Sequence, residues 1–211
     1  MKLYSFFRSS ASYRVRIALG LKGLAYDYHP VDLRSEQDLS AYLSVNPQGL
    51  VPALEDQGDI FIQSLAIIEY LEETHPQPPL LPSTAAQRAR VRGLAQVVAC
   101  EIHPLDNLRV LNYLGGPMKQ GEEVKLAWYR HWIAVGLGCL EALLKDHPAT
   151  GRFCHGDSPT LADICLVPQL YNARRFQCEL SPYPTLLRID AACAALPAFQ
   201  NACPEAQPDA G

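Results

Sequence analysis

Two adjacent serines, Ser9 and Ser10, lie where a short β-prone run ends and a helical pattern begins. The first turn of a helix has unpaired N–H groups and a partial positive charge. A serine hydroxyl beside such an end can hold an anion, including the thiolate of a bound thiol. A plain structural interpretation is also open, because serine is a common N-cap residue. These residues alone therefore indicate either a helix cap or an anion site.

The stretch from Arg8 to Leu19, RSSASYRVRIAL, resembles the SSCxWRVRIAL signature of zeta-class glutathione transferases, the class that includes maleylacetoacetate isomerases. Two positions depart from the signature: Ala11 stands where that family usually has Cys, and Tyr13 where it usually has Trp. The resemblance implies that Ser9, with Ser10 beside it, stabilises the thiolate of glutathione. The missing cysteine removes an accessory thiol and leaves the serine role open.

The composition is that of an ordinary globular protein, with 211 residues of which 48% are hydrophobic and 19% charged. A net charge of −4 indicates no basic surface for nucleic acid. No apolar stretch reaches the ~18 residues that a membrane span needs, and the N-terminus lacks the features of a signal peptide. We therefore expect a cytoplasmic protein with neither a nucleic acid nor a membrane as partner.

No cysteine occurs before residue 100, and no CxxC occurs, so neither a zinc ribbon nor a dithiol redox motif is indicated. We expect buried, reduced thiols at the following positions: Cys100, Cys139, Cys154, Cys165, Cys178, Cys193 and Cys203. Because the first 80 residues contain no cysteine, sulfur chemistry there would need a sulfur that arrives with a ligand. The histidines lack metal-ligand spacing, so no metal site is predicted.

The first 80 residues alternate strand and helix patterns in the order β-α-β-α-β-β-α. Strands are predicted at 2–6, 25–31, 51–55 and 60–63, and helices at 12–22, 36–43 and 64–75. After a proline-rich linker, QPPLLPS, only helices are predicted, at 84–113 with a kink at His103–Pro104, 122–146, 160–176, 185–196 and 197–203. The last eight residues are expected to fray.

This layout resembles that of cytosolic glutathione transferases. The resemblance implies an α/β thioredoxin-like, glutathione-binding domain over residues 1–79 and an all-α, substrate-binding domain over 84–211. It also implies a homodimer.

Three stretches of the first domain bear on glutathione. The segment LVPAL resembles the VPxL segment of the superfamily, in which the proline is cis and the preceding residue pairs with glutathione through its backbone. This role falls on Val51 and Pro52. Gln63 and Ser64 resemble the start of the family's ESxAIxxYL box, with Ser64 as the predicted N-cap whose neighbouring amides take a carboxylate. Gln48 is a further candidate contact for the glycine end.

In the second domain, LVPQLYNARRFQ resembles the LVPQxxNAxRF box of zeta members, which makes Arg175 the arginine for a substrate carboxylate. Arg109, and Arg8 from the first domain, are expected to converge on the same cleft. Arginine suits planar carboxylates because it can donate two parallel hydrogen bonds. Taken singly, each arginine could instead be a solvated surface charge.

The fourth helix of the family supplies polar residues that face glutathione, and His103 and Asn107 match those positions. Asp106 departs from the pattern, because bacterial relatives tend to have Asn there. Arg174 stands at a position where family members vary.

The resemblance implies a glutathione-dependent cis–trans isomerase for a dicarboxylate, with maleylacetoacetate as substrate. Maleylpyruvate is the close alternative. General glutathione conjugation or haloacid dehalogenation, and a non-catalytic interaction module, are the other open interpretations.

Overall fold

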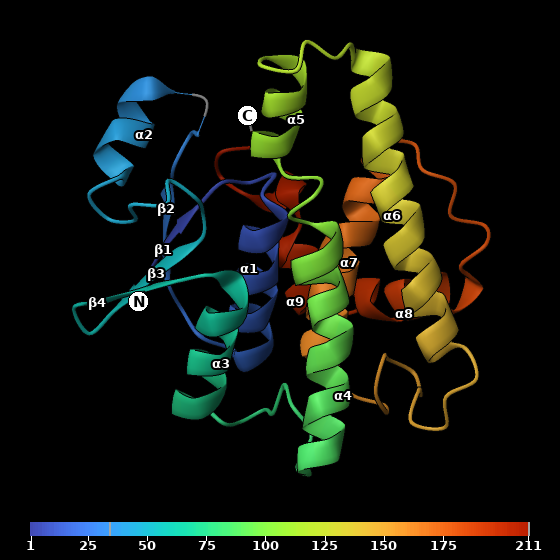
Figure 1. Cartoon of the computed structure of the whole chain (residues 1–211). Helices are drawn as coiled ribbons and strands as arrows, with labels where there is room; N and C mark the ends of the chain where they lie inside the picture. Colours follow the sequence, from blue (N-terminus) through green and yellow to red (C-terminus); the bar gives the residue numbers. More distant parts are fainter. Residues whose placement is uncertain (34, 211) are drawn as a thin grey trace. The chain divides into compact units, whose positions relative to one another are not determined.

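In the computed structural model, which describes residues 1–33 and 35–210, four strands form one mixed sheet (Figure 1). The strands are β1 (Lys2–Ser5), β2 (Asp27–Pro30), β3 (Ala53–Asp56) and β4 (Asp59–Ile62), in the spatial order β2-β1-β3-β4. Strand β1 is parallel to β2 and antiparallel to β3, with Leu3 opposite both Tyr28 and Leu54. Since β1 is central, the turn that follows it starts from the interior of the sheet.

Three helices complete the predicted β-α-β-α-β-β-α order: α1 (Ser10–Lys22), α2 (Glu36–Tyr42) and α3 (Ser64–Thr74). This confirms the thioredoxin-like fold of the first part of the chain. Helix α1 ends as predicted at Gly23, whose φ of 65° lies in the left-handed region that glycine adopts without strain.

The second unit, Leu81–Cys193, is all-helical. Its helices are α4 (Ala85–Gln96), α5 (Leu108–Gly115), α6 (Glu122–Leu144), α7 (Leu161–Arg175) and most of α8 (Pro184–Ala194). Helix α7 is largely buried and packs against α4. It begins with a capping box, in which Asp163 accepts hydrogen bonds from Thr160 and from the amide of Cys154.

The prediction of one helix over residues 84–113 is wrong in its continuity, whereas the predicted kink at His103–Pro104 coincides with the point where the helix ends. Helix α4 passes at Val97 into a π-helix, η1 (Val97–Ile102), and a turn separates η1 from α5. Pro104 cannot donate to the helix ladder, and Asn107 caps the new helix with its side-chain oxygen. Residues 103–107 are therefore not helical and separate η1 from α5.

The prediction that the C-terminal tail frays is also wrong. Residues 194–211 cluster with Met1–Leu80 in the first unit, whereas the sequence placed them in the helical domain. This segment contains α9 (Pro197–Ala202), which packs on α1, and a 3₁₀ turn, η2 (Pro204–Ala206). Gly20 allows the close approach, because a Cβ there would lie 3.3 Å from that of Ala198.

Among the described residues, no helix combines the length and the apolar character that crossing a bilayer requires.

Candidate active site

Ser9 caps α1, as its position in the sequence indicates. Its φ and ψ of −68° and 118° are extended, and its hydroxyl oxygen accepts a hydrogen bond from the amide of Ser12 at 3.2 Å. Ser9 is half-buried, whereas Ser10 is buried as the first residue of the helix. Because capping uses only a lone pair of Ser9, the hydroxyl proton stays available to an anion. The cap and the anion site are therefore compatible.

A buried arginine, Arg16, binds the backbone of this turn, a feature that the helical pattern of the sequence does not reveal. The guanidinium of Arg16 donates to the carbonyl oxygens of Phe6 and Phe7 and to the hydroxyl of Ser5. The amide of Ser9 donates to the same Phe6 oxygen at 2.9 Å. The backbone just before Ser9 is thus fixed by a charged group from the helix that Ser9 caps.

The segment before Pro52 is held from two sides. The Val51–Pro52 bond is cis, as the resemblance implied. The carbonyl oxygen of Leu50 accepts hydrogen bonds from the hydroxyl of Tyr42 at 2.8 Å and from the side-chain amide of Asn46 at 2.6 Å. Burial raises the pKa of Tyr42 to about 12, which keeps its hydroxyl a donor at neutral pH.

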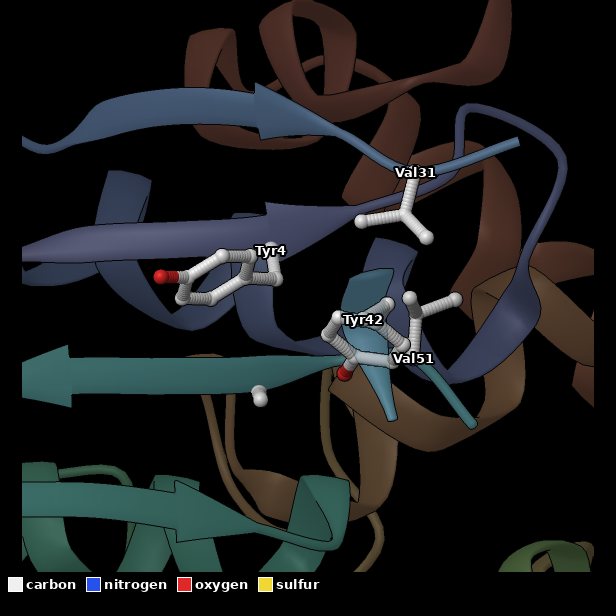
Figure 2. Packing of buried hydrophobic residues seen from close by; sticks show 5 residues of the cluster. Tyr4, Val31, Tyr42 and Val51 are labelled. Atoms are coloured by element: carbon white, nitrogen blue, oxygen red, sulfur yellow. The ribbon is translucent and has the colours of Figure 1, made fainter. Parts of the chain in front are cut away.

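An apolar cluster anchors Val51 to the sheet. Figure 2 shows the side chains of Tyr42 and Val51 beside each other, with Tyr4 and Val31 from the strand region, and Ala53 completes this cluster. The position of Val51 therefore follows from core packing of the sheet.

Two predicted glutathione contacts lie side by side: the side-chain amide of Gln63 donates to the Gln48 side-chain oxygen at 2.8 Å. The prediction that Ser64 is the N-cap of α3 is wrong. Gln63 occupies the cap position with a φ of 70°, and no side chain caps the helix. Ser64 is buried in the first turn, where its hydroxyl accepts a hydrogen bond from Arg14 at 3.3 Å. Arg14 is itself buried, which explains why this hydroxyl turns toward it.

In the second unit, the predicted polar residues flank the break after η1. Asn107 accepts a hydrogen bond from the amide of Arg109 at 3.0 Å, so its side-chain oxygen caps α5. His103 is half-buried at the end of η1. His103 thus ends η1 and Asn107 begins α5, on the two sides of the break. Turns of π-helix are frequent at functional sites.

The three candidate arginines and the neighbouring Arg174 have different surroundings. Arg8 lies over the ring of Phe7 and Arg175 over the ring of Phe176, with the guanidinium carbon 4.8 and 4.9 Å from the ring centres. Arg8, Arg109 and Arg175 are exposed. Arg174 forms an ion pair with Asp190 at 2.6 Å, which gives it a structural role within the second unit. The convergence of the other three on one diacid stays a prediction.

Asp106 is a buried carboxyl group that sequence reasoning noted only as a departure. It is 7% exposed, and neither side-chain oxygen has a hydrogen-bond partner among the described residues. Burial raises its pKa to about 8. Burial is also the main cause of the raised pKa of Tyr129 and of Cys178, and Asp106 adds to both shifts. At neutral pH the group is therefore mainly the neutral acid.

The cysteines are free, but the expectation that all are buried is wrong. Cys100 and Cys139 are exposed, whereas Cys154, Cys165 and Cys193 are buried. Burial raises the pKa of Cys154 and Cys193, which makes them poor nucleophiles. Within residues 1–33 and 35–210 the structure forms no cluster of three or more His, Cys, Asp or Glu that could hold a metal ion.

Comparison with known proteins gives consistent matches over the chain. The glutathione S-transferase N-terminal domain matches residues 3–79, and the C-terminal domain matches residues 127–201. Maleylacetoacetate isomerase of Pseudomonas aeruginosa is 51% identical over 213 residues, covering 99% of this chain and 98% of the relative.

Two solved structures are similar along the whole chain. A maleyl pyruvate isomerase, described as a bacterial glutathione S-transferase of the zeta class, superposes with a TM-score of 0.97 at 51% identity, covering both chains completely. Maleylacetoacetate isomerase of Anaeromyxobacter dehalogenans, with dicarboxyethyl glutathione and citrate in its active site, has a TM-score of 0.88 at 48% identity, covering 100% of this chain and 93% of the other.

We predict that Asp106→Asn makes the protein more stable than wild type, by a margin that grows with pH. The folded protein keeps the Asp106 proton up to about pH 8, whereas the ordinary pKa is 3.8. The wild-type free energy of unfolding therefore falls between these two values, by at most about 1.4 kcal/mol per pH unit from this group, and then levels off.

Urea unfolding followed by tryptophan fluorescence at several pH values measures this margin. Asp157→Asn, at an exposed aspartate of the same unit, controls for the loss of one charge. Parallel pH curves for wild type and Asp106→Asn would contradict the prediction.

Proposed function

The chain belongs to the zeta class of the glutathione S-transferase family, and we propose that it is a glutathione-dependent isomerase that converts maleylacetoacetate to fumarylacetoacetate. The hydroxyl of Ser9 carries the proposal, because it caps α1 and keeps a proton to donate at a turn whose domain, residues 1–79, has no cysteine. A reactive sulfur at this turn must come with a ligand, and glutathione is the cofactor that supplies it.

The first unit fits glutathione on three counts. Helix α3 begins without a side-chain cap, so its first amides are open to a carboxylate. Gln63, at the cap position, has a positive φ, a conformation that persists where the surrounding structure enforces it, often at ligand sites. Val51 and Pro52 form the cis peptide expected beside the cysteinyl part. We therefore assign Ser9, Gln48, Val51, Pro52, Gln63 and Ser64 to glutathione binding, with His103 and Asn107 from the second unit.

Bound glutathione supplies a thiolate for reversible addition to the conjugated carbon–carbon double bond, which can rotate while it is single. Ser9 would donate its hydroxyl proton in a hydrogen bond to that thiolate, and the partial positive charge at the start of α1 would favour the anion. The buried Ser10 would support the turn from the first helical position. These contributions keep the sulfur ionised at neutral pH.

The diacid would be held by arginines. Arg8, Arg109 and Arg175 are exposed cations, each able to bind a carboxylate with two hydrogen bonds. Positive charge at this place would also offset the negative charge that develops on the substrate when the thiolate adds. The citrate bound in the related isomerase supports a site for carboxylates.

Maleylpyruvate is the second candidate substrate, because a maleyl pyruvate isomerase is as similar to this chain as the maleylacetoacetate isomerases are. The two substrates differ by a small group that a pocket discriminates weakly. General conjugation and haloacid dehalogenation share the thiolate and differ in product, and a conjugating transferase consumes glutathione. A non-catalytic module would need none of the site and would fail to bind immobilised glutathione.

We further propose a cytoplasmic homodimer. The support for a dimer is the family, together with exposed apolar side chains on α6, Val124, Val135 and Leu143. Light scattering at micromolar concentration should give twice the chain mass of 23.3 kDa. A mass that stays at one chain over this range would refute the dimer.

Turnover of maleylacetoacetate and maleylpyruvate, each with and without glutathione, tests the main proposal. We expect turnover only with glutathione, faster with maleylacetoacetate, and no loss of free glutathione. Ser9→Ala should lower kcat/KM by about 100-fold, the usual effect of removing one donor to a reacting anion. Thr84→Ala removes the N-cap of α4 and is the control for a lost cap. Stoichiometric consumption of glutathione would favour conjugation instead.

Arg175→Ala should raise the KM for the dicarboxylate about tenfold or more, the loss expected for a charged hydrogen bond, and affect a neutral electrophile much less. The matched control is Arg174→Ala, which removes the neighbouring arginine and its ion pair with Asp190. We expect that control to leave the KM unchanged. Equal effects of Arg175→Ala on both electrophiles would exclude carboxylate binding by Arg175.

A further inference from the structure

The backbone N–H and C=O of Phe7 are bound by two side chains of opposite charge, the half-buried Asp209 and the buried Arg16. The amide of Phe7 donates to the Asp209 carboxylate at 3.0 Å, and the carbonyl oxygen of Phe7 accepts from Arg16 at 3.0 Å. Phe7 lies two residues before Ser9. Neither hydrogen-bonding group of Phe7 is left to water, so the backbone that leads into the serine turn has little freedom.

Arg16 connects this turn to the C-terminal segment. Its side chain is 1% exposed, and its Nε donates to the carbonyl oxygen of Ala202 at 3.0 Å while both terminal nitrogens hold the turn. Tyr13 adds a second link from α1 to the same segment through the carbonyl of Phe199 at 3.4 Å. A single buried cation thus fixes the end of α9 and the start of α1 against each other.

The segment after α9 is folded so that its last aspartate returns to the turn. The side-chain amide of Gln207 donates to the carbonyl oxygens of Asn201 and Cys203, both at 2.9 Å. One oxygen of Asp209 then accepts from Phe7, and the other accepts from the hydroxyl of Tyr28 on β2 at 2.6 Å. Burial, and next this hydrogen bond, raise the pKa of Tyr28, so the tyrosine remains a donor.

We propose that Asp209 is a positioning residue for the reaction: it holds the Phe7–Ser9 turn in the geometry in which Ser9 stabilises the glutathione thiolate. The C-terminal segment is then part of the thiolate-activating machinery, although it lies about two hundred residues from Ser9 in the sequence. The inference rests on the proposed function, because it needs glutathione bound at Ser9. Small displacements of a positioned group can cost large factors in rate.

The experiment measures the pKa of the glutathione thiol on the full-length protein, from thiolate absorbance, together with kcat and KM. Asp209→Ala should raise the bound-thiol pKa by about one pH unit, equivalent to about tenfold less thiolate near neutral pH. It should lower kcat about tenfold with a smaller change in the KM for glutathione. Asp209→Asn should restore both, because its amide can accept from Phe7 and donate to the oxygen of Tyr28.

Two further variants guard against a purely structural effect. Tyr28→Phe keeps the aromatic ring and removes one of the two hydrogen bonds of Asp209. It should therefore give an intermediate shift in thiol pKa and in kcat. If Asp209→Ala does not fold, Tyr28→Phe tests the inference in its place. Glu205→Ala removes an exposed carboxylate from the same segment and should change neither quantity.

An unchanged thiol pKa and kcat in folded Asp209→Ala, or in Tyr28→Phe if the alanine variant is unfolded, would overturn the inference. So would an equal effect of Glu205→Ala. If the wild-type protein itself fails to bind glutathione or to lower its thiol pKa, the proposed function fails, which is a separate result.

Discussion

The buried guanidinium of Arg16 is the constraint on which the first unit depends. A charge taken out of water is costly unless hydrogen bonds replace its hydration, and desolvation accordingly lowers the pKa of Arg16. Four oxygens supply those bonds, from Ser5, Phe6, Phe7 and Ala202. The planar, forked guanidinium can bind them all at once, which a lysine could not do. The end of β1, the serine turn and α9 are therefore fixed by one side chain.

A second buried cation, Lys22, is bound by hydrogen bonds in the same way at the C-terminal end of α1. The side chain of Lys22 is fully buried and donates to Glu72 at 2.8 Å and to the carbonyl oxygens of His75 and Pro78. Glu72 also accepts from the amide of Leu80 at 2.9 Å. The start of the proline-rich linker is thus bound to α1 and α3. Helix α1 carries both Arg16 and Lys22, so the helix that Ser9 caps also binds the C-terminal segment and the start of the linker.

The sequence predicted what depends on local pattern and missed what depends on distant partners. Alternating strand and helix patterns located every strand and helix of the sheet domain. Helix α1 begins after Ser9 and ends before Gly23, in agreement with the sequence pattern. Helical periodicity cannot reveal that four oxygens bind Arg16, three from the end of β1 and the turn after it and one from Ala202, 186 residues away. Composition likewise made the last eight residues look like a fraying tail, although Asp209 has its partners at Phe7 and Tyr28.

The candidate site illustrates why a cap and a catalytic group need not be alternatives. A hydroxyl oxygen has two lone pairs and one proton. At Ser9 the amide of Ser12 uses one lone pair at 3.2 Å, and this bond fixes the direction of the side chain without using its proton. The proton can then be donated to an anion that arrives at the helix end, where the backbone already favours negative charge. Replacement of the family's cysteine by Ala11 removes a neighbouring thiol and none of these elements. The turn needs a fixed backbone, which the hydrogen bonds from Arg16 to the carbonyl oxygens of Phe6 and Phe7 provide, and in the proposed mechanism the ligand brings the sulfur.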